Sequence, residues 1–388
     1  MIEKTNCSLF KICGGCQLLD LNYTDTLNFK LNFVNQCLKE QKIKYHIEKI
    51  IGANQNIEYR NKMILAFRKV NGKIISGFYE ENSHKIVNVE KCMMHSKVQN
   101  EIAQGIKKII EELRLQPYDE DRKSGLIRYV IIKEAVKTNE ILIVVVTSSD
   151  VFVARSEFVK RVRTLSQSIK TIIQNINSRK TSIVLGEKER ILYGKGYICD
   201  EFMHIYFPIS SKSFYQVNPL QTIRLYQTVK DFANLKKNDR ILDAYSGVGT
   251  IGMILANQVK EVISVENNRQ SVMVGIHHAK ENQIKNLHFV CDDATNFIQK
   301  LVFNREKIDC LIMDPPRNGS TPAFLHSTLD LKPRKIIYVS CGPESLARDL
   351  KILCQKDYII SKSCLVDMFC WTKHVETVML LCLKEPKK

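Results

Sequence analysis

The chain has 388 residues, of which 44% are hydrophobic and 26% charged, and this composition is typical of a globular protein with two or three hydrophobic cores. Its longest apolar runs are strand-sized and no hydrophobic segment follows the N-terminus, which argues against a membrane or secreted protein and predicts a cytoplasmic one. The formal net charge of +17 indicates a polyanionic partner, with nucleic acid as the first candidate and lysine enrichment from an AT-rich genome as the alternative.

The chain contains thirteen cysteines but no sign of secretion, and in such chains cysteines usually serve as metal ligands, catalytic thiols or core residues. Cys7, Cys13 and Cys16 lie close together near the N-terminus, and Cys92 follows far downstream. Three closely spaced thiolates with a distant fourth can bind zinc or an iron–sulfur cluster. The sequence therefore predicts a metal site, with unliganded cysteines as the alternative.

The first half of the chain mixes strand-like and helical patterns and contains no internal repeat. Alternating or continuous apolar runs predict strands, whereas two amphipathic stretches have helical spacing. An α+β region is therefore expected. The predicted strands are residues 63–68, 74–79, 126–135 and 140–147, and the predicted helices are residues 98–115 and about 155–169.

From about residue 207 onward, strand-like segments alternate with helical ones, and this order is typical of a doubly wound parallel sheet. We therefore expect two domains, residues 1–207 and 208–388, with ligands at the carboxyl ends of the strands of the second. The predicted helices include residues 219–235 and 269–283, and the predicted strands are residues 240–244, 261–266, 286–291, 309–313 and 335–340, followed by two closing strands at 358–367 and 376–383.

A glycine-rich loop follows the first strand of this second domain, in Asp243-Ala244-Tyr245-Ser246-Gly247-Val248-Gly249. Glycines permit a tight turn and the close approach of a ligand to the backbone. Glu266 ends the next strand, where a carboxylate can accept hydrogen bonds from both ribose hydroxyls of an adenosine cofactor. The pattern suits a dinucleotide or S-adenosylmethionine, and the spacing from Asp243 to the glycines favours the latter.

Two more turns follow strands of the same predicted sheet. Asp314-Pro315-Pro316-Arg317 ends the fourth strand, and its paired prolines predict a rigid turn at the edge of a pocket, as in many nucleic-acid methyltransferases, or a purely structural turn. Cys341 follows the fifth strand and precedes a helix start. Backbone N–H groups of that start are predicted to lower the pKa of the thiol, although an inert core thiol is the commoner fate of a cysteine.

Together these motifs resemble the RNA (uracil-C5)-methyltransferases, and among them the 23S ribosomal RNA members with an iron–sulfur cluster. The resemblance covers nearly the whole chain, with the motifs in the family's order. It implies an α/β protein whose C-terminal Rossmann-like class I methyltransferase domain is preceded by an α+β domain carrying the cysteine cluster. Besides the glycine loop and the paired-proline turn, it rests on Ser213-Phe214-Tyr215-Gln216-Val217-Asn218, Ser340-Cys341, Leu346-Ala347-Arg348-Asp349-Leu350, Asp367-Met368-Phe369 and His374-Val375-Glu376.

The resemblance implies a role for each residue of the site. The Cys341 thiolate would add to carbon 6 of uracil, and Glu376 would remove the proton from carbon 5 after methylation. A surface ion pair for Glu376 and a helix cap for Gln216 remain the alternatives. Contacts to S-adenosylmethionine would come from Gln216, Tyr245, Glu266 and Asp314, with Asp293 near the adenine.

The resemblance also favours an iron–sulfur cluster over zinc at the cysteine site, with a structural or RNA-binding role. The small RNA-binding barrel that many relatives carry before the cluster is expected to be absent. Arg60 and Lys62 are therefore candidates for RNA contact, or else ordinary surface charges. The implied ligands of the 4Fe–4S cluster are Cys7, Cys13, Cys16 and Cys92.

The expected activity is methyl transfer from S-adenosylmethionine to carbon 5 of a uridine in 23S ribosomal RNA, by a monomeric enzyme with no membrane partner. A tRNA uridine is the rival substrate, and a non-catalytic RNA-binding factor is the rival from another class. A 5-methylcytosine enzyme is disfavoured because the paired-proline turn lacks the cysteine of that motif. The chain departs from the family at Cys370, where proline is usual, and at Ser345, where threonine is commoner.

Overall fold

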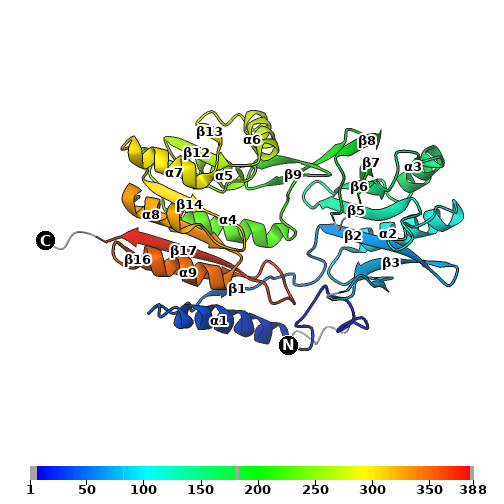
Figure 1. Ribbon diagram of the computed structural model, residues 1–388, viewed down its shortest axis with the longest axis horizontal. Helices are drawn as coiled ribbons and strands as arrows, with labels where there is room; N and C mark the ends of the chain where they lie inside the picture. Colours follow the sequence, from blue (N-terminus) through cyan, green and yellow to red (C-terminus); the bar gives the residue numbers. More distant parts are fainter. Residues whose placement is uncertain (1–6, 82, 180–182, 385–388) are drawn as a thin grey trace.

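The computed structural model of the protein describes residues 7–81, 83–179 and 183–384. Within these ranges the chain forms two large β-sheets, which lie next to each other along the long axis of the molecule (Figure 1). Each sheet has its own covering helices and its own hydrophobic cores.

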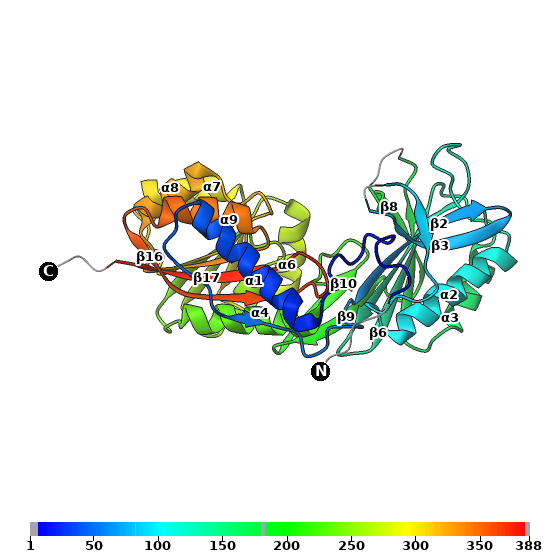
Figure 2. The same cartoon turned by 90° about the horizontal axis from the view of Figure 1, so that it is seen from below.

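The first sheet has seven strands in the order β4-β3-β2-β5-β6-β7-β8. Its neighbours are antiparallel except β6 and β7, because helix α3 (Arg155–Arg163) crosses over between these two strands. Helix α3 and the longer α2 (Lys97–Glu112) cover one face of the sheet (Figure 2). The strands are β2 (Lys62–Val70), β3 (Lys73–Tyr79), β4 (Ile86–Asn88), β5 (Ile127–Ala135), β6 (Glu140–Thr147), β7 (Ile169–Ile176) and β8 (Lys188–Tyr193).

A hairpin joins the two halves of the molecule. It consists of β9 (Tyr197–Phe202) and β10 (Ile205–Ser210), which pair with each other. Ile209 belongs to the core beneath the first sheet, whereas Phe202 and Phe207 belong to a core of the second half. The hairpin therefore packs on both sheets.

The second sheet has eight strands in the order β1-β16-β17-β15-β14-β11-β12-β13. Strand β17 is antiparallel to both of its neighbours and the other pairs are parallel, as in a doubly wound α/β sheet. Its strands are β1 (Ile50–Ile51), β11 (Arg240–Ala244), β12 (Glu261–Glu266), β13 (Leu287–Cys291), β14 (Cys310–Met313), β15 (Lys335–Ser340), β16 (Tyr358–Val366) and β17 (Glu376–Leu383).

Helices cover both faces of this second sheet, which explains why its central strands are apolar almost without interruption. Three of them, α4, α5 and α6, pack on one face, and α7, α8 and α9 pack on the other together with α1. Their bounds are α1 (Tyr23–Glu40), α4 (Pro219–Ala233), α5 (Thr250–Ala256), α6 (Arg269–Glu281), α7 (Ala294–Phe303), α8 (Pro322–Leu331) and α9 (Pro343–Leu353).

The N-terminal part of the chain packs on this second sheet as well as on the first. Helix α1 lies against α9 (Figure 2), and its Val34 and Leu38 share a core with Leu346 and Leu350. Strand β1 pairs with β16 at the edge of the sheet. The expected first domain, residues 1–207, is therefore not one continuous body, because the segment that contains α1 and β1 packs with the C-terminal half.

No helix in the described part of the chain is both long and apolar enough to cross a membrane.

Candidate active site

A cavity of about 530 Å³ lies at the carboxyl ends of the central strands of the second sheet. Tyr245 follows β11, Asp314 follows β14 and Cys341 follows β15, so three adjacent strands each contribute one side chain to its wall. Glu376 begins β17, and Gln216 lies in the connection before α4; both line the same cavity. The fold thus brings these five predicted site residues together from distant parts of the sequence.

The register between β15 and β17 explains why Cys341 and Glu376 are neighbours. Ser340, at the end of β15, pairs with Thr377 in the antiparallel strand β17. Because the strands run in opposite directions, the residue after Ser340 lies beside the residue before Thr377. Glu376 is only 6% exposed, and Cys341 is half-buried. A thiol and a buried carboxyl group therefore meet at one wall of the cavity.

The pKa of the Cys341 thiol moves in the direction opposite to the one predicted from the sequence. Burial, as the largest cause, and the carboxyl groups of Glu376 and Asp314 together raise this pKa to about 11, while the guanidinium of Arg317 opposes the rise. The predicted helix start is present, since α9 begins two residues after the cysteine. Burial and negative charge outweigh the helix start, so the prediction of a lowered pKa was wrong.

Three carboxyl groups around the cavity have raised pKa values, and burial is the largest cause for each. The pKa of Asp243 rises to about 7 and that of Asp314 to about 7, and the pKa of Glu376 rises well above its ordinary value. Asp314 also raises the pKa of Glu376 through charge repulsion. A cavity of this kind favours a positively charged ligand, because a cation lets the carboxyl groups ionise at lower cost.

The glycine loop connects β11 to α5, and Ser246, Gly247 and Val248 of this loop line the cavity. Gly249 adopts a left-handed backbone with φ of 75°, and a Cβ at this position would lie 2.5 Å from the ring of Phe289. Asp243 is buried and accepts a hydrogen bond from the backbone N–H of Gly252 at 3.1 Å, which holds the first turn of α5 against the strand. The loop requires glycine here both for its conformation and for space.

Two residues predicted to contact the cofactor have other roles in this structure. Glu266 does not line the cavity; its carboxylate accepts hydrogen bonds from the backbone N–H groups of Gly247 at 3.0 Å and Asn268 at 2.8 Å. The Glu266 carboxylate therefore links the glycine loop to the N-terminus of α6. Asp293 caps α7 through the backbone N–H groups of Thr295 and the residue after it, and it also lies off the cavity wall.

Further side chains line the cavity wall that the sequence did not mark as site residues, although most belong to the motifs named above. Phe214 is 73% exposed near the mouth, and Phe369 also contributes an aromatic ring. The guanidinium of Arg317 donates a hydrogen bond to the ring of His374, with a distance of 3.0 Å to Nδ1. Asn268, at the start of α6, had no motif to reveal it. The mouth thus combines aromatic and cationic groups, which suit a nucleotide.

The four predicted cluster cysteines line a second cavity, of about 420 Å³, between the N-terminal segment and the first sheet. Burial raises the pKa of Cys16 to about 12, with added repulsion from the other three, while Arg60 opposes the rise. Within the described residues, however, no group of three or more histidine, cysteine or acidic side chains is arranged to hold a metal ion. The iron–sulfur cluster therefore stays a prediction. Its implied ligands are Cys7, Cys13, Cys16 and Cys92.

A search against protein-family models matches residues 22–384 of the chain to the family described as tRNA (uracil-5-)-methyltransferase. The chain belongs to this family. Similar curated proteins include an uncharacterized RNA methyltransferase of Clostridium acetobutylicum, 39% identical over 97% of this chain and 82% of the relative. Another, from Halalkalibacterium halodurans, is 35% identical over 97% of this chain and 83% of the relative.

Among solved structures, the chain is similar to the tRNA (uracil-54, C5)-methyltransferase of Pyrococcus abyssi in complex with S-adenosyl-L-homocysteine. The TM-score is 0.80 at 28% identity, and the match covers 95% of this chain and 84% of that one. The family and this likeness agree with the α/β methyltransferase fold. The protein is therefore an S-adenosylmethionine-dependent RNA methyltransferase of the uracil-5 family.

Proposed function

We propose that the enzyme methylates carbon 5 of a uridine in 23S ribosomal RNA through a covalent bond between Cys341 and the uracil ring. The observation that supports this most strongly is the position of Cys341 beside Glu376 in one cavity with Asp314. A nucleophile and a base on the same wall are the two groups that such a reaction needs.

In the proposed reaction the Cys341 thiolate adds to carbon 6 of uracil, and the electron pair of the C5–C6 double bond moves to form an enolate. Carbon 5 thereby becomes a nucleophile and would take the methyl group that bound S-adenosylmethionine supplies, with the electron pair of the broken S–CH3 bond leaving on S-adenosylhomocysteine. Glu376 then removes the proton from carbon 5, the electron pair of that C–H bond restores the double bond, and the thiolate leaves. The raised pKa of Glu376 suits this step, since it makes the carboxylate a stronger base.

The acidic side chains of the cavity suit the positively charged sulfonium of the cofactor. We propose that Gln216, Tyr245 and Asp314 contact it directly, since all three line the wall. Glu266 would face the ribose from the edge of the glycine loop. The Gln216 backbone is fixed from the other half of the molecule, because the side-chain amide of Asn61 donates a hydrogen bond to its carbonyl at 2.9 Å.

The direct test compares methyl transfer by the wild type and by Cys341→Ala, with labelled S-adenosylmethionine. We expect the substitution to abolish transfer and to leave cofactor binding largely intact. Cys354→Ala is the matched control, because this cysteine caps the C-terminal end of α9, the helix that follows Cys341, and lies outside the cavity. Full turnover by Cys341→Ala would refute the covalent mechanism.

A tRNA uridine is the second candidate substrate, and the likeness to the Pyrococcus abyssi tRNA enzyme supports it. We favour ribosomal RNA because of the cysteine cluster that the ribosomal members carry. Incubating the enzyme with labelled cofactor and with either RNA separates the two, and mapping the product to a single nucleotide identifies the target. If only tRNA is labelled, the substrate is a tRNA uridine and not a ribosomal one. The proposed covalent mechanism would then still apply.

The cysteine cavity is proposed to hold a 4Fe–4S cluster. Its support is that four cysteines from two distant segments line one cavity beside the cation of Arg60, which would offset the negative charge of a thiolate-bound cluster. Anaerobically purified protein should then contain iron and sulfide and absorb visible light. Cys16→Ser should lose both, whereas Cys199→Ser, in the hairpin, should keep them. Iron-free wild-type protein, or bound zinc, would contradict this proposal.

A further inference from the structure

The loop between β16 and β17 positions several groups of the active site at once. Phe369 and His374 of this loop line the cavity, and the loop ends at Glu376, the proposed base. Whatever fixes the loop therefore also fixes the base. The loop contains no proline from Asp367 to Glu376, so its conformation depends on contacts with other segments.

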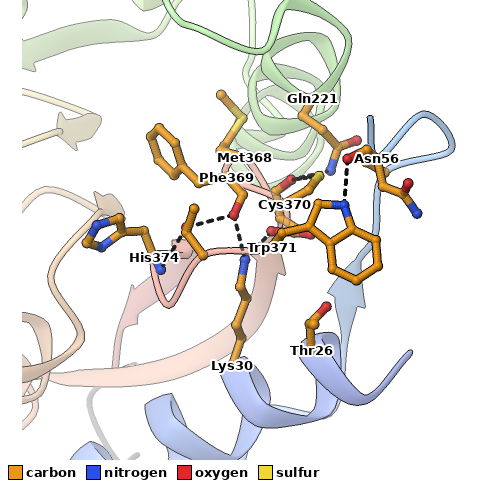
Figure 3. A network of polar contacts seen from close by, with 12 residues as sticks. Thr26, Lys30, Asn56, Gln221, Met368, Phe369, Cys370, Trp371 and His374 are labelled. Carbon is orange, nitrogen blue, oxygen red and sulfur yellow. Dashed lines mark hydrogen bonds and ion pairs between the residues drawn. The ribbon is translucent and has the colours of Figure 1, made fainter. Parts of the chain in front are cut away.

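Lys30 of helix α1 reaches this loop from the opposite end of the sequence. Its side chain is completely buried and forms an ion pair with Asp367, which is completely buried as well. The same ammonium donates a hydrogen bond to the backbone carbonyl of Phe369 at 3.0 Å. Figure 3 shows Lys30 pointing from α1 to the loop, beside Phe369. One cation thus contacts the loop at two places.

The carbonyl of Phe369 is the centre of the turn that follows. It also accepts hydrogen bonds from the backbone N–H of Thr372 at 3.2 Å and from its hydroxyl at 2.8 Å. The Thr372 hydroxyl in turn accepts one from the backbone N–H of His374 at 3.2 Å. A series of hydrogen bonds therefore runs from Lys30 through Phe369 and Thr372 to His374, which lies two residues before Glu376.

Other residues from the N-terminal part of the chain hold the loop from the same side. The indole N–H of Trp371 donates to the carbonyl of Asn56 at 2.8 Å, as Figure 3 shows. The hydroxyl of Tyr23 donates to Asp367 at 2.7 Å. Further contacts are the backbone N–H groups of Gln17 and Leu18 with the carbonyl of Trp371, and the hydroxyl of Tyr59 with the carbonyl of Cys370, each at 3.0 Å.

Stability alone does not explain a buried lysine at this position. Removing two charges from water is expensive, and an apolar pair of similar volume is often as stable as a buried ion pair or more so. What an apolar residue cannot supply is a donor for the carbonyl of Phe369 and a fixed partner for Asp367. The pair therefore specifies where the loop lies, and Lys30 does so without lining the cavity.

We propose that Lys30 is a positioning residue of the methylation reaction, which holds the loop from Asp367 to Glu376 so that the Glu376 carboxylate reaches the proton on carbon 5. The inference rests on the proposed function of Glu376. It assigns to α1, which lies outside the cavity, a role in the proton-removal step.

The experiment compares Lys30→Met with the wild type at saturating RNA and cofactor. Because a misplaced group slows only the step it serves, kcat should fall on the order of tenfold to hundredfold, while KM and the cofactor Kd change little. The methylated covalent adduct should also accumulate on denaturing gels, because its release waits for the base. Leu38→Ala is the matched control, since it weakens the packing of the same helix in the core shared with α9, and a leucine side chain makes no hydrogen bond to the loop.

A second variant separates a loss of loop positioning from a loss of the fold. Lys30→Met/Asp367→Asn leaves no unpaired buried charge, yet it still lacks the donor to Phe369, so it should fold and show the same loss of kcat and the same adduct. Recovery of wild-type kcat by the double variant would overturn the proposal, as would a loss in Lys30→Met no larger than in Leu38→Ala. Methyl transfer by Cys341→Ala is measured in parallel. Full activity of that variant would refute the proposed function rather than the role of Lys30.

Discussion

Cys341 lies between two carboxyl groups and one guanidinium, and the balance among them controls how much thiolate is present. Burial, Glu376 and Asp314 raise the pKa of the thiol to about 11, and Arg317 opposes them. The sequence revealed the cysteine, the helix after it and the carboxyl groups, but not how closely they lie. Only the register of β15 and β17 shows that Glu376 is adjacent to the sulfur.

Arg317→Gln should therefore make the thiol less acidic. Without the guanidinium the pKa of Cys341 rises further, and each unit of rise lowers the thiolate fraction about tenfold at neutral pH. The check is the rate at which iodoacetamide alkylates the Cys341 peptide between pH 7 and 11, followed by mass spectrometry. Arg305→Gln removes the same charge far from the cavity and serves as the control. An unchanged midpoint in Arg317→Gln would show that the guanidinium does not act on the sulfur.

At the scale of elements, the sequence predicted the second half of the chain well because its strands are apolar, short and separated by helices. Strands β11, β12, β15 and β17 have the predicted bounds. Helix α1 was missed, because its buried face includes the polar Thr26 and Lys30. The partner of Lys30 lies 337 residues away, so no local pattern could reveal why a lysine is buried there.

The glycine loop gives a prediction about one element. Gly249→Ala should cost about 1 kcal/mol or more in stability and weaken cofactor binding about tenfold or more, because alanine resists the left-handed conformation and its Cβ meets Phe289. Gly72→Ala is the control, since it has a similar φ of 81° in open space. Calorimetry of both variants with S-adenosylhomocysteine checks this. Equal cofactor affinity in the two would contradict the assigned role of the loop.

At the scale of the whole molecule, the N-terminal segment meets the loop from Asp367 to Glu376 beside the active site. The N-terminal segment passes the cysteine cavity, supports the loop before β17 and then forms α1 on the C-terminal sheet. A hydrophobic cluster joins Cys16, Tyr59 and Trp371, so the cysteine cavity and the base-carrying loop share one packing unit. The sequence alone suggested a division at residue 207, since composition and periodicity carry no information about which sheet a segment joins.

The buried carboxyl groups also shape the stability of the whole molecule. Because the pKa of Glu376 is raised on folding, the folded state keeps a proton that the unfolded state has lost, and stability falls as the pH rises above about 4.5. Glu376→Gln removes this titration, so its melting temperature should exceed that of the cofactor-free wild type at pH 8 but not at pH 4.5. Glu344→Gln, at an exposed carboxyl group on α9, should show no such difference. Parallel pH dependence in Glu376→Gln and wild type would contradict the raised pKa.

The most direct test of the covalent mechanism is to look for the adduct itself. Glu376→Gln, incubated with substrate RNA and S-adenosylmethionine, should form a covalent RNA–protein complex on denaturing gels, because the cysteine adds and the methyl group transfers but the carbon 5 proton stays. Mass spectrometry should place the methylated uridine on Cys341, and Cys341→Ala/Glu376→Gln should form no complex. The absence of a complex in Glu376→Gln while the wild type remains active, or a link to a different cysteine, would contradict the account.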